Sequence, residues 1–504
     1  MKRILFLFVG LFTLFSCAVD DVDTASSDDY TNFTTDSNQY SISEEEALAN
    51  LYAFMGEGGD SRSSDNRVVN SVVPIKYNSL GTRAVEGVDC ENLLYIANFE
   101  NEEGYAILAG DTRIDDEVIA ITDRGSLESE VLNNIIVEWE DGERPHFEGY
   151  PTTGPGFFTT PETGDELFMN PNTVNLFVDE EQDTLVGDFD LSLYSDNGGN
   201  NISQDTEYQF PEALSLSLCT SYAMREIIEF NPNPREDFDG GDNNTRIDVT
   251  YSPWVDTKIT TSILDPYVSW HQEKPFNDLF PTVREYIVIG RSRVAPAGCF
   301  PLALAKILAH FEYPVNIVYK NNVVYWDRLK ENYNSVLGSK SAATLLKWIS
   351  DACDSWPFYQ GTFTFPYRVR DFMSYLEIDN VHIHSYSFDR VEYMIDRGLP
   401  LLIYAMPNLR FWESHAWNID GYKIKQRTKT TKLYVDNVLE ETTNSIEIRK
   451  MPHCDFGWQG SANGYYASGI FDLRSSYAEL DWGNHNRTDN YNKYLHVITY
   501  SLPQ

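Results

Sequence analysis

The hydrophobic period of the chain changes once in its second half, and this change constrains the fold more than any other feature. Apolar residues at helical spacing come first, over residues 299–311, 342–352 and 366–376. Strand-like runs dominate afterwards, beginning with "LPLLIYAM" and ending with "YLHVITYSL". Helices followed by antiparallel strands predict an α+β fold, in which a helical layer packs on an antiparallel sheet.

The first half predicts a smaller α+β domain over residues 40–130. Residues 42–56 carry apolar residues at helical spacing behind a Ser and three Glu, which is typical of a capped first turn. A hairpin in "LLYIANFENEEGYAILAGD" and a strand in "DEVIAITDRG" follow. Residues 131–245 contain Gly, Pro and Asn clusters around one predicted helix, "ALSLSLCTSYAMREIIEF", and this linker or accessory region has no predicted role. The second domain is then expected to span residues 246–504.

The first seventeen residues have the features of an export signal: a Lys-Arg pair, an apolar run, and Cys17 directly after Leu-Phe-Ser. This ending is similar to the lipobox of bacterial lipoproteins, in which the Cys becomes the lipidated first residue; an ordinary cleavable signal is the alternative. Residues 18–39 are acidic and rich in Ser and Thr, and they predict a flexible tether. No later run reaches the roughly 18 apolar residues of a membrane span, so we expect an exported outer-membrane or cell-surface lipoprotein held by lipid alone.

Acidic residues are concentrated in the first half of the chain. Residues 1–250 hold 12 Lys and Arg against 50 Asp and Glu, whereas residues 251–504 hold 26 against 27. This balance argues against nucleic acid or an anionic membrane surface as a partner, because binding to phosphate needs basic patches. Five cysteines follow Cys17, an odd number for an exported protein, so at least one thiol is expected to stay free. No cysteine or histidine cluster has metal-ligand spacing, and no cofactor is expected.

Cys299 stands at the head of an apolar helix, in "VAPAGCFPLALAKILAHFEYP". The helix dipole and the unpaired N–H groups at a helix N-terminus stabilise a thiolate and lower the pKa of the thiol. That is how a cysteine nucleophile is prepared. For an isolated Gly-Cys pair, a small buried core residue is the competing interpretation.

Cysteine catalysis also needs a histidine to form the ion pair and to protonate the leaving amine. Of the nine histidines, His415 opens the strand-like "HAWNIDGY", where the backbone would fix its ring. The stretch "MPHCDFGWQGSANGYY" supplies Asp455 to orient the imidazole and Trp458 to shield it from water. Each of these residues taken alone is compatible with a purely structural role. Their order along the chain is that of papain-like peptidases.

Four stretches together resemble the streptopain and interpain family of bacterial cysteine peptidases. "GCFPLALAKILAHFEYP" is similar to that family's nucleophile helix, "HAWNIDGY" to its histidine strand, and "HCDFGWQGSANGYY" to its His-x-Asn-Trp-Gly-Trp segment. "WHQEKPFN" is similar to the segment whose Gln lines the oxyanion hole, which is Gln272 here. The resemblance implies a papain-like peptidase domain that acts on protein or peptide substrates through Cys299 and His415.

The resemblance extends into the acidic half. "LLYIANFENEEGYAILAGDTRIDDEVIAITDRGSL" is similar to the inhibitory propeptide of the same family. The resemblance therefore implies a zymogen whose own N-terminal propeptide is an intramolecular inhibitor. Activation by proteolysis between the two halves is then expected.

Three positions depart from the family pattern. Asp455 replaces the orienting Asn, Glu413-Ser414 replaces a Gly-Gly pair before the histidine, and Phe456 replaces the first Trp of Trp-Gly-Trp. An additional hairpin, containing "KLYVDNVLEETTNSIEIRK", is expected near the cleft. These departures keep a second interpretation open, a non-catalytic binding or inhibitor protein on a peptidase scaffold. An acyl-transfer enzyme such as a transglutaminase would use the same Cys/His chemistry.

Overall fold

The computed structural model describes residues 40–56, 66–77, 90–127, 176–179, 184–187, 211–229, 245–284, 292–359, 361–405, 414–471 and 495–502. The predicted export signal with Cys17 and the tether over residues 18–39 lie outside the described residues, as does most of 131–245. Residues Tyr40–Gln504 form one compact unit. The predicted domains on either side of residue 245 both belong to this unit.

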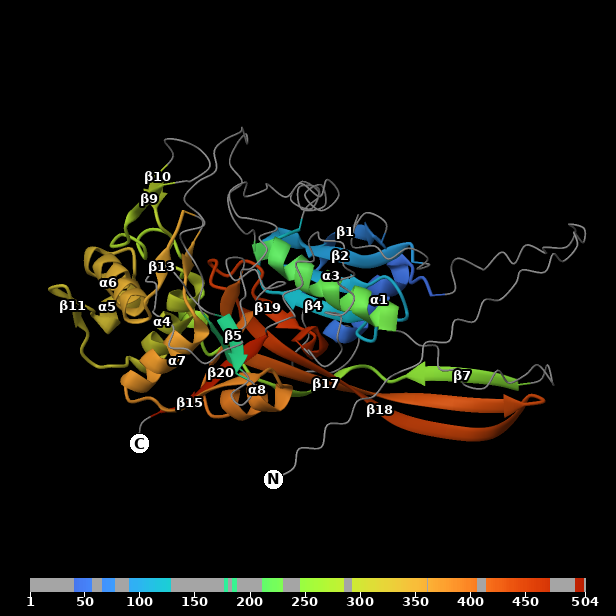
Figure 1. Ribbon diagram of the computed structural model, residues 1–504. Coiled ribbons are helices and arrows are strands. Elements are labelled where there is room, and N and C mark those ends of the chain that lie inside the picture. Colours follow the sequence, from blue (N-terminus) through green and yellow to red (C-terminus); the bar gives the residue numbers. More distant parts are fainter. Residues whose placement is uncertain are drawn as a thin grey trace, which may run out of the picture. The chain divides into compact units, whose positions relative to one another are not determined.

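One antiparallel sheet runs through both predicted domains (Figure 1), in the strand order β1-β2-β3-β4-β19-β18-β17-β16-β20-β15, with β7 and β8 paired to β17. The strands are β1 (Val69–Lys76), β2 (Asn92–Phe99), β3 (Tyr105–Ala109), β4 (Val118–Thr122), β7 (Thr245–Tyr251), β8 (Val255–Ile259), β15 (Asp379–Ser385), β16 (Leu401–Ala405), β17 (His415–Val435), β18 (Val438–Asp455), β19 (Gly464–Tyr466) and β20 (His496–Ser501). The N-terminal strands join the others where β4 pairs with β19.

Two helices, α1 (Glu44–Met55) and α3 (Pro211–Glu229), pack on the N-terminal part of this sheet. The predicted cap of α1 is confirmed, because the Ser43 hydroxyl accepts the Glu46 N–H at 3.2 Å. All residues of β3 and β4 are buried, as expected for strands covered on both faces. Helix α3, which the sequence predicts inside residues 131–245, thus packs on β2 and β3 of the N-terminal domain.

The helices of the second half form the predicted layer on the sheet. They are α4 (Cys299–Phe311), α5 (Trp326–Glu331), α6 (Val336–Ala352), α7 (Pro366–Tyr375) and α8 (Phe388–Ile395). Helix α4 is the central one: it contacts β17, α6 and α7, and every residue from Phe300 to Ala309 is buried. The predicted α+β class, with helices packed on an antiparallel sheet, is confirmed.

The remaining elements are short. They are the hairpins β5 (Leu176–Asp179) with β6 (Thr184–Gly187), β9 (Thr282–Arg284) with β10 (Ser292–Val294), β11 (Val318–Tyr319) with β12 (Asn322–Val323) and β13 (Trp356–Pro357) with β14 (Thr362–Phe363), and the 3-10 turns Glu100–Glu102, Asp265–Tyr267 and Ser468–Phe471. Among the described residues, no helix has both the length and the apolar composition of a membrane span.

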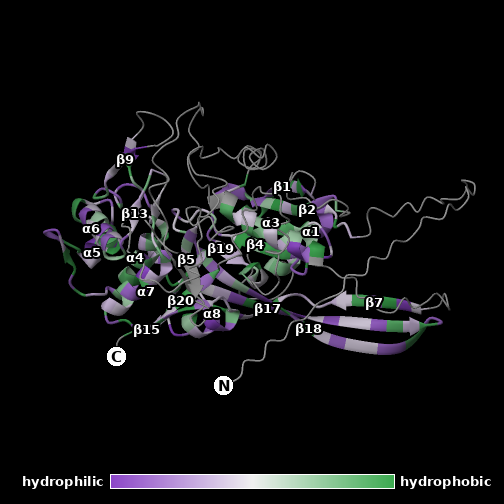
Figure 2. Cartoon of the chain, in the orientation of Figure 1, coloured by the Kyte–Doolittle hydropathy of each residue, from purple (hydrophilic) through white to green (hydrophobic). Residues whose placement is uncertain are grey.

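Strands β17 and β18 form a hairpin much longer than the separate strand-like runs of the sequence indicate. Its turn lies at Asp436 and Asn437, both with positive φ. The sequence places this hairpin near the cleft, but its far end, with β7 beside it, lies away from α4 (Figure 1). Apolar residues of β7 remain exposed there (Figure 2), with Ile247 at 61%. Residue alternation predicts a strand but not the direction in which it extends.

Candidate active site

The backbone before α4 adopts a conformation that only glycine adopts readily. Gly298 has a φ of 97°, and a Cβ at this position would lie 2.7 Å from the Thr362 carbonyl oxygen. The backbone at Gly298 therefore closely approaches that of Thr362. It places Cys299 as the first residue of α4, directly against the β13–β14 hairpin.

The Cys299 sulfur accepts backbone N–H groups from Phe300 and Ala416. These bonds favour the thiolate, as expected at a helix N-terminus. Burial opposes them and is the larger effect, because it raises the pKa of Cys299 to about 11. The sequence-based expectation of a lowered pKa is therefore wrong for this structure. The thiol is protonated at neutral pH.

His415 begins β17 and is almost completely buried, with 1% of its surface exposed. Its Nε2 lies 3.2 Å from the Phe456 carbonyl oxygen. A carbonyl can only accept, so Nε2 carries the proton and donates it. Nδ1 has no hydrogen-bond partner in the described structure. Burial lowers the pKa of His415 to about 3, so the ring is neutral at pH 7.

Two indole rings flank this imidazole. The predicted shield, Trp458, stacks on it with ring centroids 4.2 Å apart and planes 8° apart. Trp417 stacks at 5.9 Å and 13°. Sequence reasoning missed Trp417, although its position two residues after His415 puts both side chains on the same face of β17. The rings restrict the imidazole to one plane and exclude water from it.

The structure brings Cys299 next to the histidine strand but does not join the two side chains. Cys299 accepts the N–H of Ala416, the neighbour of His415. Within the described segments 292–359 and 414–471, no hydrogen bond links the Cys299 sulfur to the His415 ring. The pair is present as a neutral thiol and a neutral imidazole, and not as a thiolate and an imidazolium.

Gln272 lies in the loop before α4. Its carbonyl oxygen accepts the Ala297 N–H at 2.8 Å, two residues before Cys299. In the same loop, the Trp270 carbonyl accepts the N–H of Gln459, which follows Trp458. The loop is therefore bonded both to the start of α4 and to the turn that carries the shielding indole.

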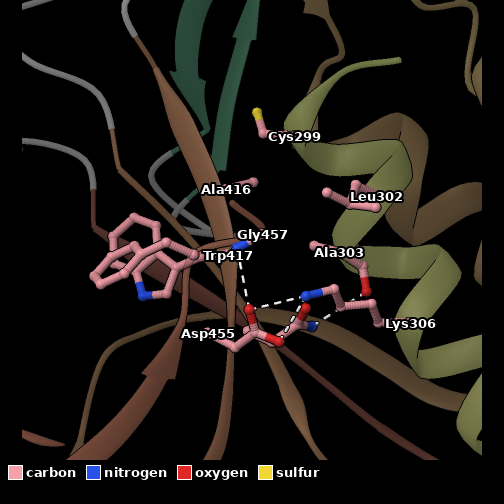
Figure 3. Close-up of a pocket in the computed structure, with 10 residues that line it drawn as sticks. Cys299, Leu302, Ala303, Lys306, Ala416, Trp417, Asp455 and Gly457 are labelled. Carbon is pink, nitrogen blue, oxygen red and sulfur yellow. Dashed lines mark hydrogen bonds and ion pairs between the residues drawn. The ribbon is translucent and has the colours of Figure 1, made fainter. Parts of the chain in front are cut away.

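Asp455, predicted to orient His415 directly, is bonded to other groups. Its two carboxylate oxygens lie 2.8 and 2.7 Å from the Lys306 Nζ (Figure 3). One of them also accepts the Gly457 N–H at 3.1 Å and the Asn463 side-chain amide at 3.0 Å. A buried ammonium attracts this carboxylate more strongly than a neutral imidazole does. The direct contact expected from the sequence is therefore not formed.

A narrow gap lies between α4 and the adjoining ends of β17 and β18 (Figure 3). Cys299, Lys306, Ala416 and Asp455 are among the residues that line it. Cys299 lies toward one end of the displayed α4 segment, and the Lys306–Asp455 pair lies toward the other (Figure 3). The described residues contain no group of three His, Cys, Asp or Glu side chains able to hold a metal ion.

The segment that contains these residues is similar to a known protein family. Residues 270–466 match the Peptidase C10 family. This segment contains Gln272, Cys299, His415 and Asp455, and the resemblance inferred from the sequence is confirmed over it. The match supports a cysteine peptidase.

A solved structure is also similar to this chain: active wild-type interpain A, a cysteine protease of Prevotella intermedia. It shares 17% sequence identity, with 48% of this chain and 94% of that chain covered and a TM-score of 0.32. No curated protein matched the chain.

Proposed function

We propose that the protein is an exported, lipid-anchored cysteine endopeptidase that is made as a zymogen. The observation that carries this proposal is the arrangement at the start of α4. The Cys299 sulfur meets the N–H next to His415, and the Gln272 loop is bonded two residues before Cys299. The match of residues 270–466 to the Peptidase C10 family supports the chemistry.

The tautomer of His415 suits it to act as the base. Because Nε2 donates to the Phe456 carbonyl, the Nδ1 lone pair is available to take the thiol proton of Cys299. The thiolate then attacks the scissile carbonyl, and the new oxyanion is stabilised by the Gln272 side-chain N–H and the Cys299 backbone N–H. When the C–N bond breaks, the imidazolium returns its proton to the leaving amine. Water finally hydrolyses the thioester.

The neutral thiol and imidazole correspond to a resting, latent state in this proposal. Formation of the charged pair requires a less buried site, because burial is what raises the pKa of Cys299 and lowers that of His415. Loss of the N-terminal domain would supply that change. Arg124 of this domain approaches the turn after Trp458, since a Cβ at Gly460 would lie 3.4 Å from its Cδ.

Charge complementarity supports an inhibitory N-terminal domain. Its acidic side chains meet basic side chains of β17 and β18, and β4 continues the sheet through β19. The pairs are Glu117 with Arg427 at 2.7 Å, Asp116 with Arg449 at 3.0 Å and Asp123 with His453 at 2.8 Å. Acidic side chains of the N-terminal domain are thereby paired with Arg427, Arg449 and His453 of the second half.

Labelling by the epoxide inhibitor E-64 tests the proposal. The full chain, before and after limited proteolysis between the halves, is treated with E-64 and analysed by mass spectrometry. We expect one label, on Cys299, gained faster after proteolysis, and none in Cys299→Ala. Cys353→Ala, which removes another buried thiol, is the matched control and should label as the wild type does. Cleavage of denatured casein by Cys299→Ala would refute the assignment of the nucleophile.

A binding or inhibitor protein is the second candidate. It is favoured by the neutral Cys299–His415 pair and by the bonding of Asp455 to Lys306. A proteolysed chain that remains folded by circular dichroism but takes up no E-64 would favour this candidate. Labelling at Cys299 would exclude it.

Membrane attachment rests on the sequence alone. Export as a lipoprotein is tested by feeding radioactive palmitate to cells that express the chain, with Cys17→Ser as the control. Incorporation into the wild type only would support the anchor. Accessibility to added protease on intact cells would then distinguish the cell surface from the periplasm.

A further inference from the structure

Lys306 is the unusual residue of the nucleophile helix. It lies within an apolar run of α4 and is completely buried, with none of its surface exposed. Lysine is rarely buried to this extent unless its charge is paired, because desolvation of an ammonium is costly. Its partner Asp455, 149 residues later in the sequence, is only 2% exposed. Apolar packing of the helix does not explain why a lysine is buried at this position.

The pair connects the nucleophile helix to the strand that approaches the histidine. Lys306 follows Cys299 by seven residues, which is about two helical turns, so both side chains lie on the same face of α4. Asp455 is the last residue of β18 and pairs in register with Asn418, three residues after His415. The bond between the two charges therefore fixes α4 against both strands of the site.

Asp455 also controls the turn that follows it. Its carboxylate accepts the Gly457 N–H and the Asn463 amide, while the Asn463 side-chain oxygen accepts the Phe456 N–H at 2.9 Å. The Phe456 peptide group is thus held on both sides. Its carbonyl is the group that accepts the Nε2–H of His415.

We propose that Lys306 and Asp455 are a positioning pair for the reaction. They hold the Phe456 carbonyl in place, so that His415 keeps its proton on Nε2 and offers Nδ1 to Cys299. Asp455 thus acts on the imidazole through the backbone, and not by the direct contact that its sequence position indicates. The inference rests on the proposed peptidase function, because it assigns a role in that reaction.

Two variants of the full chain separate positioning from simple stability. Asp455→Ala removes the carboxylate that binds Lys306, Gly457 and Asn463. The double variant Lys306→Gln with Asp455→Asn removes both charges but keeps a hydrogen-bonding amide pair: the Asn oxygen can still accept from Gly457 and Asn463, while its N–H donates to the Gln oxygen. Ile349→Ala is the matched control, because it makes a cavity in buried α6 without touching the turn.

The first measurement is the nitrogen-15 NMR spectrum of labelled histidine in the full chain, with the His415 signals assigned by their loss in His415→Ala. We expect wild type, Ile349→Ala and the double variant to show the Nε2–H form. Asp455→Ala should show a mixture of tautomers. Retention of a pure Nε2–H form in folded Asp455→Ala would overturn the proposal.

The second measurement is peptide hydrolysis after limited proteolysis. We expect Asp455→Ala to lose about 100-fold in kcat with KM little changed, because a misplaced base affects the chemical step more than binding. The double variant should recover most of that loss. A folded Asp455→Ala with the kcat and pH profile of Ile349→Ala would contradict the inference. If the wild type itself does not hydrolyse peptides or label with E-64, the proposed function fails, and the NMR result still decides the positioning role.

Discussion

Two charge clusters each include a buried residue of strand β18, and they differ in what they connect. Lys306 and Asp455 join α4, the helix that begins at Cys299, to the end of β18. His453 lies between Asp420 of β17, at 2.6 Å, and Asp123 of the N-terminal domain, at 2.8 Å. The first cluster can set the geometry of the site. The second links the N-terminal domain to β17 and β18, and its basic residue is a histidine.

Burial lowers the pKa of His453 as it lowers that of His415, but only His453 has carboxylates beside it. At the Cys299–His415 pair burial is not opposed in this way. It leaves the thiol and the imidazole neutral, because neither has an opposite charge beside it. His453 is also buried, but the two carboxylates raise its pKa well above the ordinary 6.5. The same residue type is therefore neutral in one place and charged in the other. The comparison shows that partners, and not burial alone, decide the charge.

The largest effect is expected from removing one charge of the Lys306–Asp455 pair. Lys306→Met leaves a buried carboxylate without its cation, and should lower the free energy of unfolding by about 3–5 kcal/mol. Denaturant unfolding followed by circular dichroism measures this loss. Lys320→Met is the matched control: that lysine is 60% exposed and pairs with Asp351, so about 1 kcal/mol or less is expected. Similar losses in both variants would show that burial does not distinguish the two pairs.

The His453 cluster should make stability depend on pH. The folded state keeps on His453 a proton that the unfolded chain releases above pH 6.5. This stabilisation is complete below pH 6.5 and is lost as the pH rises through the folded pKa, by up to about 1.4 kcal/mol per pH unit. Thermal unfolding from pH 6 to pH 9 should therefore show a falling midpoint. His453→Gln should flatten that dependence, and an unchanged slope in this variant would remove His453 as its cause.

Asp116 lies at the same contact between the N-terminal domain and strands β17 and β18. It should add a smaller pH-dependent contribution to folding stability, with the same sign as that of His453 but at lower pH. It is paired with Arg449 and accepts the Tyr222 hydroxyl, with Asp115 and Glu226 as acidic neighbours. Burial raises its pKa to about 6, so its contribution is complete below pH 3.8 and is lost as the pH rises through about 6. Asp116→Asn should reduce the slope of stability with pH in that window. A slope equal to that of wild type would exclude this contribution.

The smallest effect is expected from weakening the contact between the N-terminal domain and His453 while leaving the residues around Cys299 unchanged. Asp123→Asn removes one carboxylate from His453 but leaves Asp420, and should cost about 1–3 kcal/mol of stability. The N-terminal domain should then be released by protease faster, and E-64 labelling should follow that release. Asp265→Asn, an acidic residue outside this contact, is the control. An Asp123→Asn chain that releases the domain at the wild-type rate would show that this contact does not hold it.

Much of the local structure could be predicted because its signals lie within short windows. The Ser43 cap, the hairpin of β2 and β3, and the helix that begins at Cys299 each depend on neighbouring residues. The strand position of His415 and the stacking of Trp458 follow from motifs of a few residues. These features agree with the structure because neighbours in the sequence decide them.

Other expectations failed where distant segments compete for one group. The sequence indicates Asp455 as the partner of His415, and Lys306 binds it instead. The dipole argument predicts a lowered pKa for Cys299, and burial by other elements raises it. The lone lysine in "LALAKILAHF" was the available signal for the ion pair. Its partner could not be identified, because no local rule relates positions 149 residues apart.

By itself, the sequence determined the α+β class, the positions of the principal helices and strands, and the resemblance of the segments around Cys299 and His415 to one family of peptidases. Only the tertiary structure decided which charges meet, that β4 continues the sheet through β19, and that the thiol and the imidazole are neutral. The physical reason is that hydrophobic period and capping act over a few residues. Strand register, burial and ion pairing depend instead on surfaces formed by segments hundreds of residues apart.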